Sequence, residues 1–572
     1  MMEDTLAKKC LGGKKPWCVM VYLAGGGDVS DEARESLLLM KQVGSTDNIH
    51  LIAQFDSGSE GTLTKRYYLS PCHHAVGIES LLTQAGLEVP ATVQPYDSTV
   101  GLYYCRQIKN ILSACQKDRL DRLNTAELTA LLAYSPKRFK NFVLDCILDE
   151  DIYPQPSGNL GFTNAGDPKV LANFIRWAKV RYPADHYMVV VWGHGNGLSV
   201  AWDYPSSPLV DPGDSLTAQE LRKAFENDEA EFQKEINEFR KEEPDFETEA
   251  AAYRPGIDII GFNSCSLGTI EVYRQLLGLA QFGIASEGFT PKTSWPYDRI
   301  LKALEENPGW GPEEFAERII GDYIGCYEKS VAAAEDLQKL ERKAKRLGAS
   351  LDMNIGRGQY GSDPGLNVIK PGVDLGGIKP GVDLGGIKPG IDLGIIKPRV
   401  DLSLSGADAG TGIDLSVCNL KKSDLVCRSM QKLVNLLLLK LGRRLDTGTF
   451  AAVVAAHSVS QSYFNKDFTD LYDFCRALKS FCSDAAIRSA CEAVMDSIKT
   501  FCKKRANAGI DVANSYGVSI FFPWGEWDEQ DVLARYKGLE FLKETKWNVF
   551  LRTYRKLIHH FEAGTGVFKT AK

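Results

Sequence analysis

The 572-residue sequence lacks the features that would place it in several special classes of protein. None of its 14 cysteines forms a C-x-x-C pair, so neither a structural zinc site nor a tight disulfide framework is indicated, and most should be buried, reduced thiols. No apolar run reaches the roughly 18 residues that a membrane span needs. The net charge of −7 gives no electrostatic reason to expect nucleic acid or an acidic membrane surface as a partner.

The N-terminal region also lacks a convincing signal peptide. Its first apolar run covers only residues 17–24 and is followed by Gly25-Gly26-Gly27-Asp28. This pattern is typical of a buried strand that leads into a loop, and the glycines are too few and wrongly spaced for a dinucleotide-binding fingerprint. We therefore expect a cytoplasmic protein.

What the sequence does contain is an alternation of apolar runs and amphipathic segments. This alternation predicts an α/β fold with a mostly parallel sheet flanked by helices. Asp167 and Pro168 supply a helix N-cap and a first-turn proline, and residues 65–69 are typical of an edge strand. Buried strands are predicted at residues 17–24, 49–55, 187–192, 257–262 and 282–285.

We divide the chain into a catalytic unit and later regions. Residues 1–70 and 151–345 form the unit, with 71–150 as a helical insertion that includes segments 107–115 and 125–133. A repeat-containing insertion or linker at 346–405 precedes a C-terminal α/β region, 406–572, that packs on the unit. We predict a helix at 270–279 in the catalytic unit. In the C-terminal region we predict helices at 425–441, 471–502 and 547–561, and strands at 449–456 and 517–522.

The insertion contains an almost exact tandem repeat at residues 371–402, written PGVDLGGIK, PGVDLGGIK, PGIDLGIIK and PRVDL. Pro-Gly at the junctions breaks helices, and so few units are short for a stable solenoid. A surface insertion without a catalytic role is favoured over a small β-solenoid.

Two predicted strands end in residues that can carry chemistry. His194 follows one strand and lies between Gly193 and Gly195, and Cys265 follows another within Asn263-Ser264-Cys265-Ser266. Because ligands and reactive groups collect at the carboxyl ends of parallel strands, we expect the histidine and the cysteine to lie close together.

A cysteine near a helix start and an imidazole would have its thiolate stabilised and its pKa lowered. Such a thiolate is the nucleophile of peptide acyl transfer, and the backbone N–H groups of Gly195 and Cys265 are candidates for an oxyanion pocket. A single buried cysteine is more often an inert core thiol, and a single histidine is more often structural. It is the combination of both at small-residue strand ends that favours a catalytic pair.

Several segments resemble the clostripain family of cysteine peptidases, within the larger group that shares the caspase-like fold. The resemblance lies in WCVMVYLAGGGD, VGSTDNIHLIAQFDSG, GDPKVLANFIRWAKVRYPADHYMVVVWGHGNG, IDIIGFNSCSLGTIEVYRQL, IASEGFTPKTSWPYDRIL and ANSYGVSIFFP. It implies a caspase-like sandwich in which Cys265 and His194 form the dyad of an endopeptidase that acts on polypeptides.

The resemblance also implies cleavage after Arg or Lys. Members of the family hold the basic side chain with an aspartate two residues before the nucleophile, where this sequence has Asn263, so basic preference should weaken or shift. Ser286, Glu287 and Trp295 are further candidates for substrate binding, although core packing explains Trp295 equally well.

Self-processing and metal use are two further properties that the resemblance raises. The charged stretch 225–255 bears Lys234, Arg240, Lys241 and Arg254, and is a place for self-cleavage, with an uncut charged helix as the equal alternative. Some members use calcium, but no dedicated calcium loop is present, so we predict no metal and no cofactor. The sequence does not indicate an oligomeric state.

The leading prediction is a cysteine endopeptidase with Cys265 as nucleophile and His194 as proton donor to the leaving amine. A catalytically inactive scaffold of the same fold is the alternative from another class, favoured by Asn263 and the long insertions. An acyl-transferring ligase or hydrolase that uses the same dyad is a third possibility.

Overall fold

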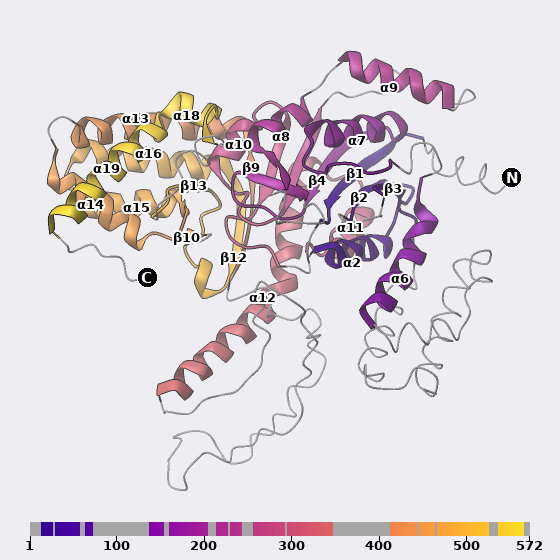
Figure 1. Cartoon of the computed structure of the whole chain (residues 1–572), viewed down its shortest axis with the longest axis horizontal. Helices are drawn as coiled ribbons and strands as arrows, with labels where there is room; N and C mark the ends of the chain where they lie inside the picture. Colours follow the sequence, from indigo (N-terminus) through magenta and orange to yellow (C-terminus); the bar gives the residue numbers. More distant parts are fainter. Residues whose placement is uncertain are drawn as a thin grey trace, which may run out of the picture.

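A computed structural model of the chain describes residues 13–26, 29–57, 63–72, 136–153, 160–203, 213–226, 229–242, 256–291, 294–346, 412–442, 445–463, 466–524 and 536–565. Its central sheet consists of β1 (Lys15–Ala24), β2 (Ile49–Asp56), β3 (Lys65–Tyr68), β4 (Ala184–Trp192), β7 (Ile257–Asn263), β8 (Ala280–Ala285), β9 (Ile413–Asn419) and β12 (Cys502–Ala508). These eight strands lie in the order β12-β9-β8-β7-β4-β1-β2-β3 (Figure 1).

The inner part of the sheet is parallel. Strands β2, β1, β4, β7 and β8 pair in parallel, whereas β3 pairs antiparallel with β2, and β9 pairs antiparallel with both β8 and β12. The α/β class and the mostly parallel sheet that the sequence predicts are therefore confirmed, with antiparallel strands added at both edges.

Side-chain alternation along β1 explains why both faces of the sheet are covered. Trp17, Val19, Val21 and Leu23 point into one apolar core, and Cys18, Met20 and Tyr22 point into the other. The first core is closed by α2 (Ser30–Lys41), α11 (Tyr297–Glu306) and α12 (Pro312–Arg346); the second by α7 (Pro168–Arg181), α8 (Ala218–Phe225) and α10 (Ile270–Gln275). Figure 1 shows these helices on opposite sides of the strands.

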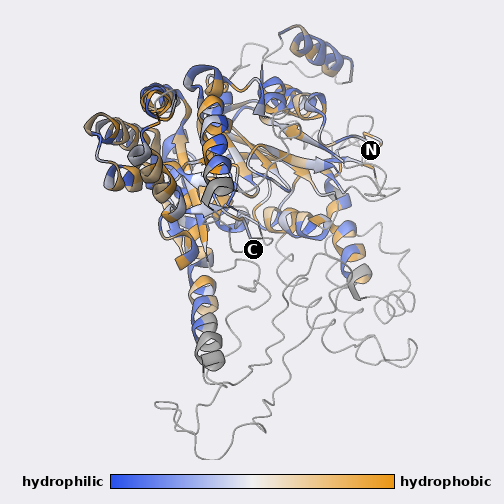
Figure 2. Ribbon diagram, turned by 60° about the vertical axis from the view of Figure 1, so that its left-hand side comes forward, coloured by the Kyte–Doolittle hydropathy of each residue, from blue (hydrophilic) through white to orange (hydrophobic). Residues whose placement is uncertain are grey.

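The chain after residue 411 completes this sheet and adds a helical layer beside it. Its strands β9 and β12 form one edge, and its helices pack into the same apolar core as α10 (Figure 1). The helices are α13 (Ser423–Leu441), α14 (Thr447–Val459), α15 (Leu471–Phe481), α16 (Ala485–Phe501), α18 (Glu540–Thr545) and α19 (Trp547–Thr565). Figure 2 shows the hydrophobic colour concentrated on the strands between mixed helices.

Smaller elements complete the described part of the chain. A hairpin of β5 (Ser199–Asp203) and β6 (Asp214–Thr217) follows β4, and α6 (Pro136–Leu148) packs on α2. A three-stranded sheet is formed by β10 (Ser462–Tyr463), β11 (Phe468–Asp470) and β13 (Ser519–Phe521), and 3₁₀ turns cover Asp149–Asp151, Leu420–Lys422 and Ile510–Val512. Within the described ranges, every helix is too short or too polar to serve as a membrane span.

One of the predicted elements in the C-terminal region is wrong. Residues 449–456, predicted as a strand, lie in helix α14, because Asp446 caps its first turn by accepting the N–H of Thr449 and because Phe450, Val453 and Ala456 repeat at helical spacing. The helical prediction for 471–502 is confirmed, and the segment forms two helices, α15 and α16, since Asp484 caps the second by accepting two backbone N–H groups.

The charged stretch between the two predicted site segments is helical where it is described. Residues Glu229–Glu242 form α9, which lies apart from the sheet in Figure 1. Residues 227–228 and 243–255 of that stretch, the segments 107–115 and 125–133, and the repeats lie outside the described residues, whereas α6 is a described helix of the predicted insertion 71–150. The predicted helix 270–279 is shorter and ends at Gln275 in α10.

Candidate active site

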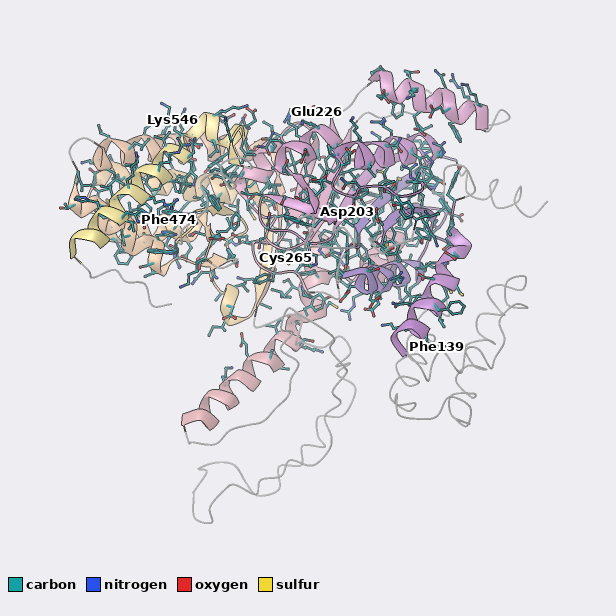
Figure 3. All side chains as sticks on the ribbon, viewed as in Figure 1. Phe139, Asp203, Glu226, Cys265, Phe474 and Lys546 are labelled. Atoms are coloured by element: carbon teal, nitrogen blue, oxygen red, sulfur yellow. The ribbon has the colours of Figure 1, made fainter. Side chains whose placement is uncertain are left out.

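The ends of β4 and β7 bring the two predicted reactive residues together. These strands pair in parallel up to Trp192 and Asn263, and the N–H of Gly193 donates to the carbonyl of Asn263 at 3.3 Å. His194 and Cys265 each lie two residues after that last pair, Trp192 and Asn263. Both residues therefore leave the sheet at the same edge. Figure 3 shows Cys265 near the middle of the molecule, between the C-terminal helices and the N-terminal part of the sheet.

The loops after the two strands touch at Gly195. A Cβ atom at this position would lie 2.3 Å from Oγ of Ser264 and 2.6 Å from the carbonyl oxygen of Cys265. Any residue larger than glycine would force the histidine loop and the cysteine loop apart. The glycine next to His194 is therefore required for the close approach of the two loops.

The cysteine loop has a strained turn that is fixed by hydrogen bonds. Ser266 has a φ of 60°, a conformation that costs a residue with a side chain on the order of 1 kcal/mol. Its N–H donates to the carbonyl of Gly288 at 2.8 Å, and the N–H of Gly268 donates to the carbonyl of Ser286, also at 2.8 Å. Residues 264–268 and 286–290 thus form one connected structure around the cysteine.

The thiol of Cys265 is bonded to this second loop. The N–H of Thr290 donates to Sγ at 3.4 Å, and the Thr290 hydroxyl donates to the carbonyl of Ser264 at 3.0 Å. Burial of the thiol is the largest effect and raises the pKa of Cys265; the Thr290 N–H lowers it, and the charge of Asp414 raises it further.

The lowered thiol pKa that the sequence predicts is therefore wrong for this structure. Helix α10 begins only at Ile270, and its cap Thr269 accepts the N–H of Val272, so its N-terminus does not stabilise a thiolate at Cys265. A thiol in these surroundings needs a base to take its proton before it can attack, and His194 is the histidine on the neighbouring strand end.

The two proposed oxyanion donors are available. Among the described residues, no acceptor takes a hydrogen bond from the backbone N–H of Gly195 or of Cys265. Both residues are partly exposed, whereas the backbone around them is bonded within the protein. An oxygen that develops negative charge beside Cys265 could accept from these groups.

The predicted substrate-binding residues lie beneath the site. Asn263 is 3% exposed, and its side-chain oxygen, when it faces the surrounding donors, accepts from the Trp192 indole at 3.2 Å and the Tyr297 hydroxyl at 3.1 Å, as well as from Ser294 and the N–H of Trp295. An oxygen with these partners holds the strand end in place. Its acceptor capacity is used inside the protein.

Ser286, Glu287 and Trp295 are fully buried. Ser286 Oγ donates to the carbonyl of Asp414 at 2.7 Å, and Glu287 Oε2 accepts the N–H of Gly517 at 2.6 Å. The ring of Trp295 packs on β7, where a Cβ at Gly261 would lie 2.8 Å from it. Their burial favours a supporting role, and for Trp295 the core-packing alternative, over direct contact with a substrate.

Sequence reasoning missed two residues next to this site. Phe289 is 59% exposed although its neighbours Gly288 and Thr290 are hydrogen-bonded to the cysteine loop, so the loop that contacts the thiol presents an aromatic side chain to solvent. Asp414 reaches the same loop from β9. An exposed phenylalanine between a glycine and a threonine is a weak sequence signal, and the strand of Asp414 lies beyond the repeats.

Within the described part of the chain, no three His, Cys, Asp or Glu side chains gather as metal ligands.

The candidate site lies in a segment that is similar to known proteins. The model of the clostripain family matches residues 156–347. Clostripain from Hathewaya histolytica is 27% identical over 156 residues, which is 26% of this chain and 27% of that protein, so the chain matches about a quarter of the relative's length.

Two solved structures are distantly similar. A secreted C11 cysteine protease from Bacteroides thetaiotaomicron, in complex with an irreversible peptide inhibitor, has 14% identity and a TM-score of 0.48 over 94% of this chain and 100% of that one. An inactive zymogen C11 protease from Parabacteroides distasonis has 12% identity and a TM-score of 0.46 over 93% and 99%. That the present protein is cytoplasmic stays a prediction. The segment that resembles the clostripain family, residues 156–347, carries both His194 and Cys265.

Proposed function

We propose that this protein is a cysteine endopeptidase that hydrolyses peptide bonds of polypeptide substrates. The observation that carries the proposal is the paired ending of β4 and β7, which delivers His194 and Cys265 to the same edge of the sheet at equivalent positions. The match of residues 156–347 to the clostripain family model supports it.

In the proposed reaction, His194 accepts the thiol proton and Sγ of Cys265 attacks the scissile carbonyl. The resulting oxyanion accepts from the N–H groups of Gly195 and Cys265; one such donor is typically worth about 3 kcal/mol in the transition state. The imidazolium then protonates the leaving amine, and water hydrolyses the thioester to regenerate the thiol.

Substrate preference is proposed from the side chains around the thiol. Cleavage after Arg or Lys would need an acceptor for the basic side chain, and the oxygen of Asn263 is already occupied by internal donors. We therefore propose that basic preference is weak here. The exposed ring of Phe289 offers apolar contact to the side chain of a substrate residue near the scissile bond.

Self-processing remains part of the proposal, with fewer candidate cleavage positions in the stretch 225–255. Proteolysis requires the cleaved chain to be extended, and Lys234, Arg240 and Lys241 lie in helix α9. We propose Arg254, which lies outside the described residues, as the position to test. Loss of cleavage in Arg254→Ala but not in Lys241→Ala would support it, and the reverse would contradict it.

The scaffold alternative is favoured by a specific observation, the raised pKa of a Cys265 thiol that is bonded to Thr290. Product analysis separates the alternatives. Incubation with a mixture of unlabelled peptides, followed by mass spectrometry, should yield new free carboxylates with the wild type and none with Cys265→Ala. A matched control, Cys418→Ala, removes a buried thiol in β9 and should leave the products unchanged. New amide bonds would indicate a ligase, and no product with any variant would indicate a scaffold.

A further inference from the structure

Asp414 connects the C-terminal region to the loop beside the thiol. It lies on β9, whose last pairing with β8 joins Ala285 to Ser416, so Asp414 extends past the end of β8 toward residues 286–288. Its Oδ2 accepts from the N–H of Glu287 at 2.7 Å and its Oδ1 from the N–H of Gly288 at 2.9 Å. Three successive residues are held by it, because the hydroxyl of Ser286 donates to its backbone carbonyl.

The loop that Asp414 holds is the one that contacts the cysteine. The carbonyl of Gly288 accepts from Ser266, and the N–H of Thr290 donates to Sγ of Cys265. A shift of residues 287–288 would therefore move both the turn that bears the thiol and the donor that bonds it. Asp414 reaches the sulfur through these backbone groups.

The surroundings of Asp414 contain these hydrogen-bond donors and, among the described residues, no cationic side chain paired with its carboxylate. It is 2% exposed, and within the described ranges no lysine, arginine or histidine forms an ion pair with it. Glu287, Tyr323, Tyr463 and Cys265 are the titratable groups that face it. A buried carboxylate without a counter-ion is costly unless hydrogen bonds to both oxygens offset the loss of water.

We propose that Asp414 is a positioning residue for Cys265. Asp414 fixes the 286–290 loop, and this loop in turn fixes the thiol of Cys265 and the backbone N–H of the same residue, which is the adjoining oxyanion donor. This inference rests on the proposed peptidase function. It gives the C-terminal region, which follows the repeats, a role in the reaction. The sequence alone indicates no site residue in that region.

The test uses the full chain and an irreversible peptide acyloxymethyl ketone, with the inactivation rate at saturating probe (kinact) and the half-saturating concentration (KI) measured separately. Asp414→Asn removes one of the two acceptors and should lower kinact by about tenfold to a hundredfold with little change in KI. The control is Asp258→Asn, because Asp258 is equally buried, accepts the N–H of Tyr187 at 2.9 Å and lies at the opposite end of β7.

A purely structural role would lower the amount of protein that can be labelled, in parallel with the melting temperature, and would leave kinact of the folded fraction unchanged. Equal kinact for Asp414→Asn and Asp258→Asn would overturn the inference. If Asp414→Asn does not fold, Asp414→Glu, which keeps the charge but displaces it, must show the same selective loss, and a wild-type kinact would overturn the inference. A wild-type protein that is not labelled at all would instead overturn the proposed function, and this inference with it.

Discussion

Glu271 should make the stability of this protein fall as the pH rises. This carboxyl group lies in α10, directly after the cysteine loop, and is fully buried. Its Oε1 accepts from the hydroxyl of Tyr536 at 2.7 Å and from the N–H of Phe521 at 3.1 Å, so it links α10 to the C-terminal region. Its Oε2 is a buried oxygen without a partner in the described residues.

Burial, which outweighs the hydrogen bonds from Tyr536 and Phe521, raises the pKa of Glu271 to about 7. Because the folded state then holds this proton more tightly than the unfolded state, whose pKa is near 4.5, folding is favoured at low pH and loses free energy as the pH rises from about 4.5 to 7. The difference of about 2.5 units corresponds to about 3 kcal/mol at pH 8.

Glu271→Gln is the perturbation that isolates this effect. Glutamine can accept both hydrogen bonds through its oxygen and never ionises, so it imitates the protonated acid. Urea unfolding in a Cys265→Ala background should show the variant equal to its parent near pH 4.5 and up to about 3 kcal/mol more stable at pH 8.

Glu238, which is exposed on α9, provides the control. Glu238→Gln should change the free energy of unfolding neither near pH 4.5 nor at pH 8. Asp414 and Asp470, whose pKa values burial raises to about 6 and about 7, give the parent a slope of the same sign that the Glu271 variant should retain. A difference between Glu271→Gln and its parent that does not depend on pH, or a less stable variant at pH 8, would refute the reasoning.

Three further predictions concern the site. Asn263→Asp should leave the rate of labelling by an arginine-based probe, relative to a leucine-based probe, unchanged, because residue 263 is buried and its side-chain oxygen is occupied by internal donors; a rise of about tenfold in this ratio would show that residue 263 faces the first side chain. Gly195→Ala should cost about 1–3 kcal/mol of stability and most of the labelling rate, because its Cβ would meet the cysteine loop. Gly256→Ala, with nothing within 4 Å, should be neutral, and equal effects would contradict the packing argument. Phe289→Ala should lower kcat/KM for apolar peptides about fivefold without loss of stability. Phe481→Ala, at a half-exposed ring in α15, should not, and a similar loss there would reject Phe289 as a substrate contact.

The sequence predicts those parts of the fold that local patterns determine. Parallel strands buried on both faces are continuous apolar runs, which is why β1, β4 and β7 could be placed, and the small residues after them identified His194 and Cys265. Asp167 was likewise recognisable as the cap of α7, where it accepts the N–H of Lys169. Each of these inferences needs only a few neighbouring residues.

The features that the sequence did not predict depend on contacts between distant segments. The surroundings of the thiol are set by Thr290 and Asp414, which lie on other parts of the chain, and by the turn at Ser266 that delays the start of α10. Burial of Asn263 by donors from Trp192 and Tyr297 could not be read from its position before the cysteine. The run at 449–456 was ambiguous because short apolar segments fit a strand or a buried helix equally well.

Covalent labelling of Cys265 tests the central claim most directly. The protein would be treated with peptide acyloxymethyl ketones that differ in their first residue, and the modified residue identified by mass spectrometry in wild type, His194→Ala and Cys418→Ala. The account predicts modification of Cys265 in the wild type and in Cys418→Ala, and a loss of at least about a hundredfold in rate in His194→Ala. Failure of every probe to modify Cys265, or labelling at the same rate without His194, would contradict it.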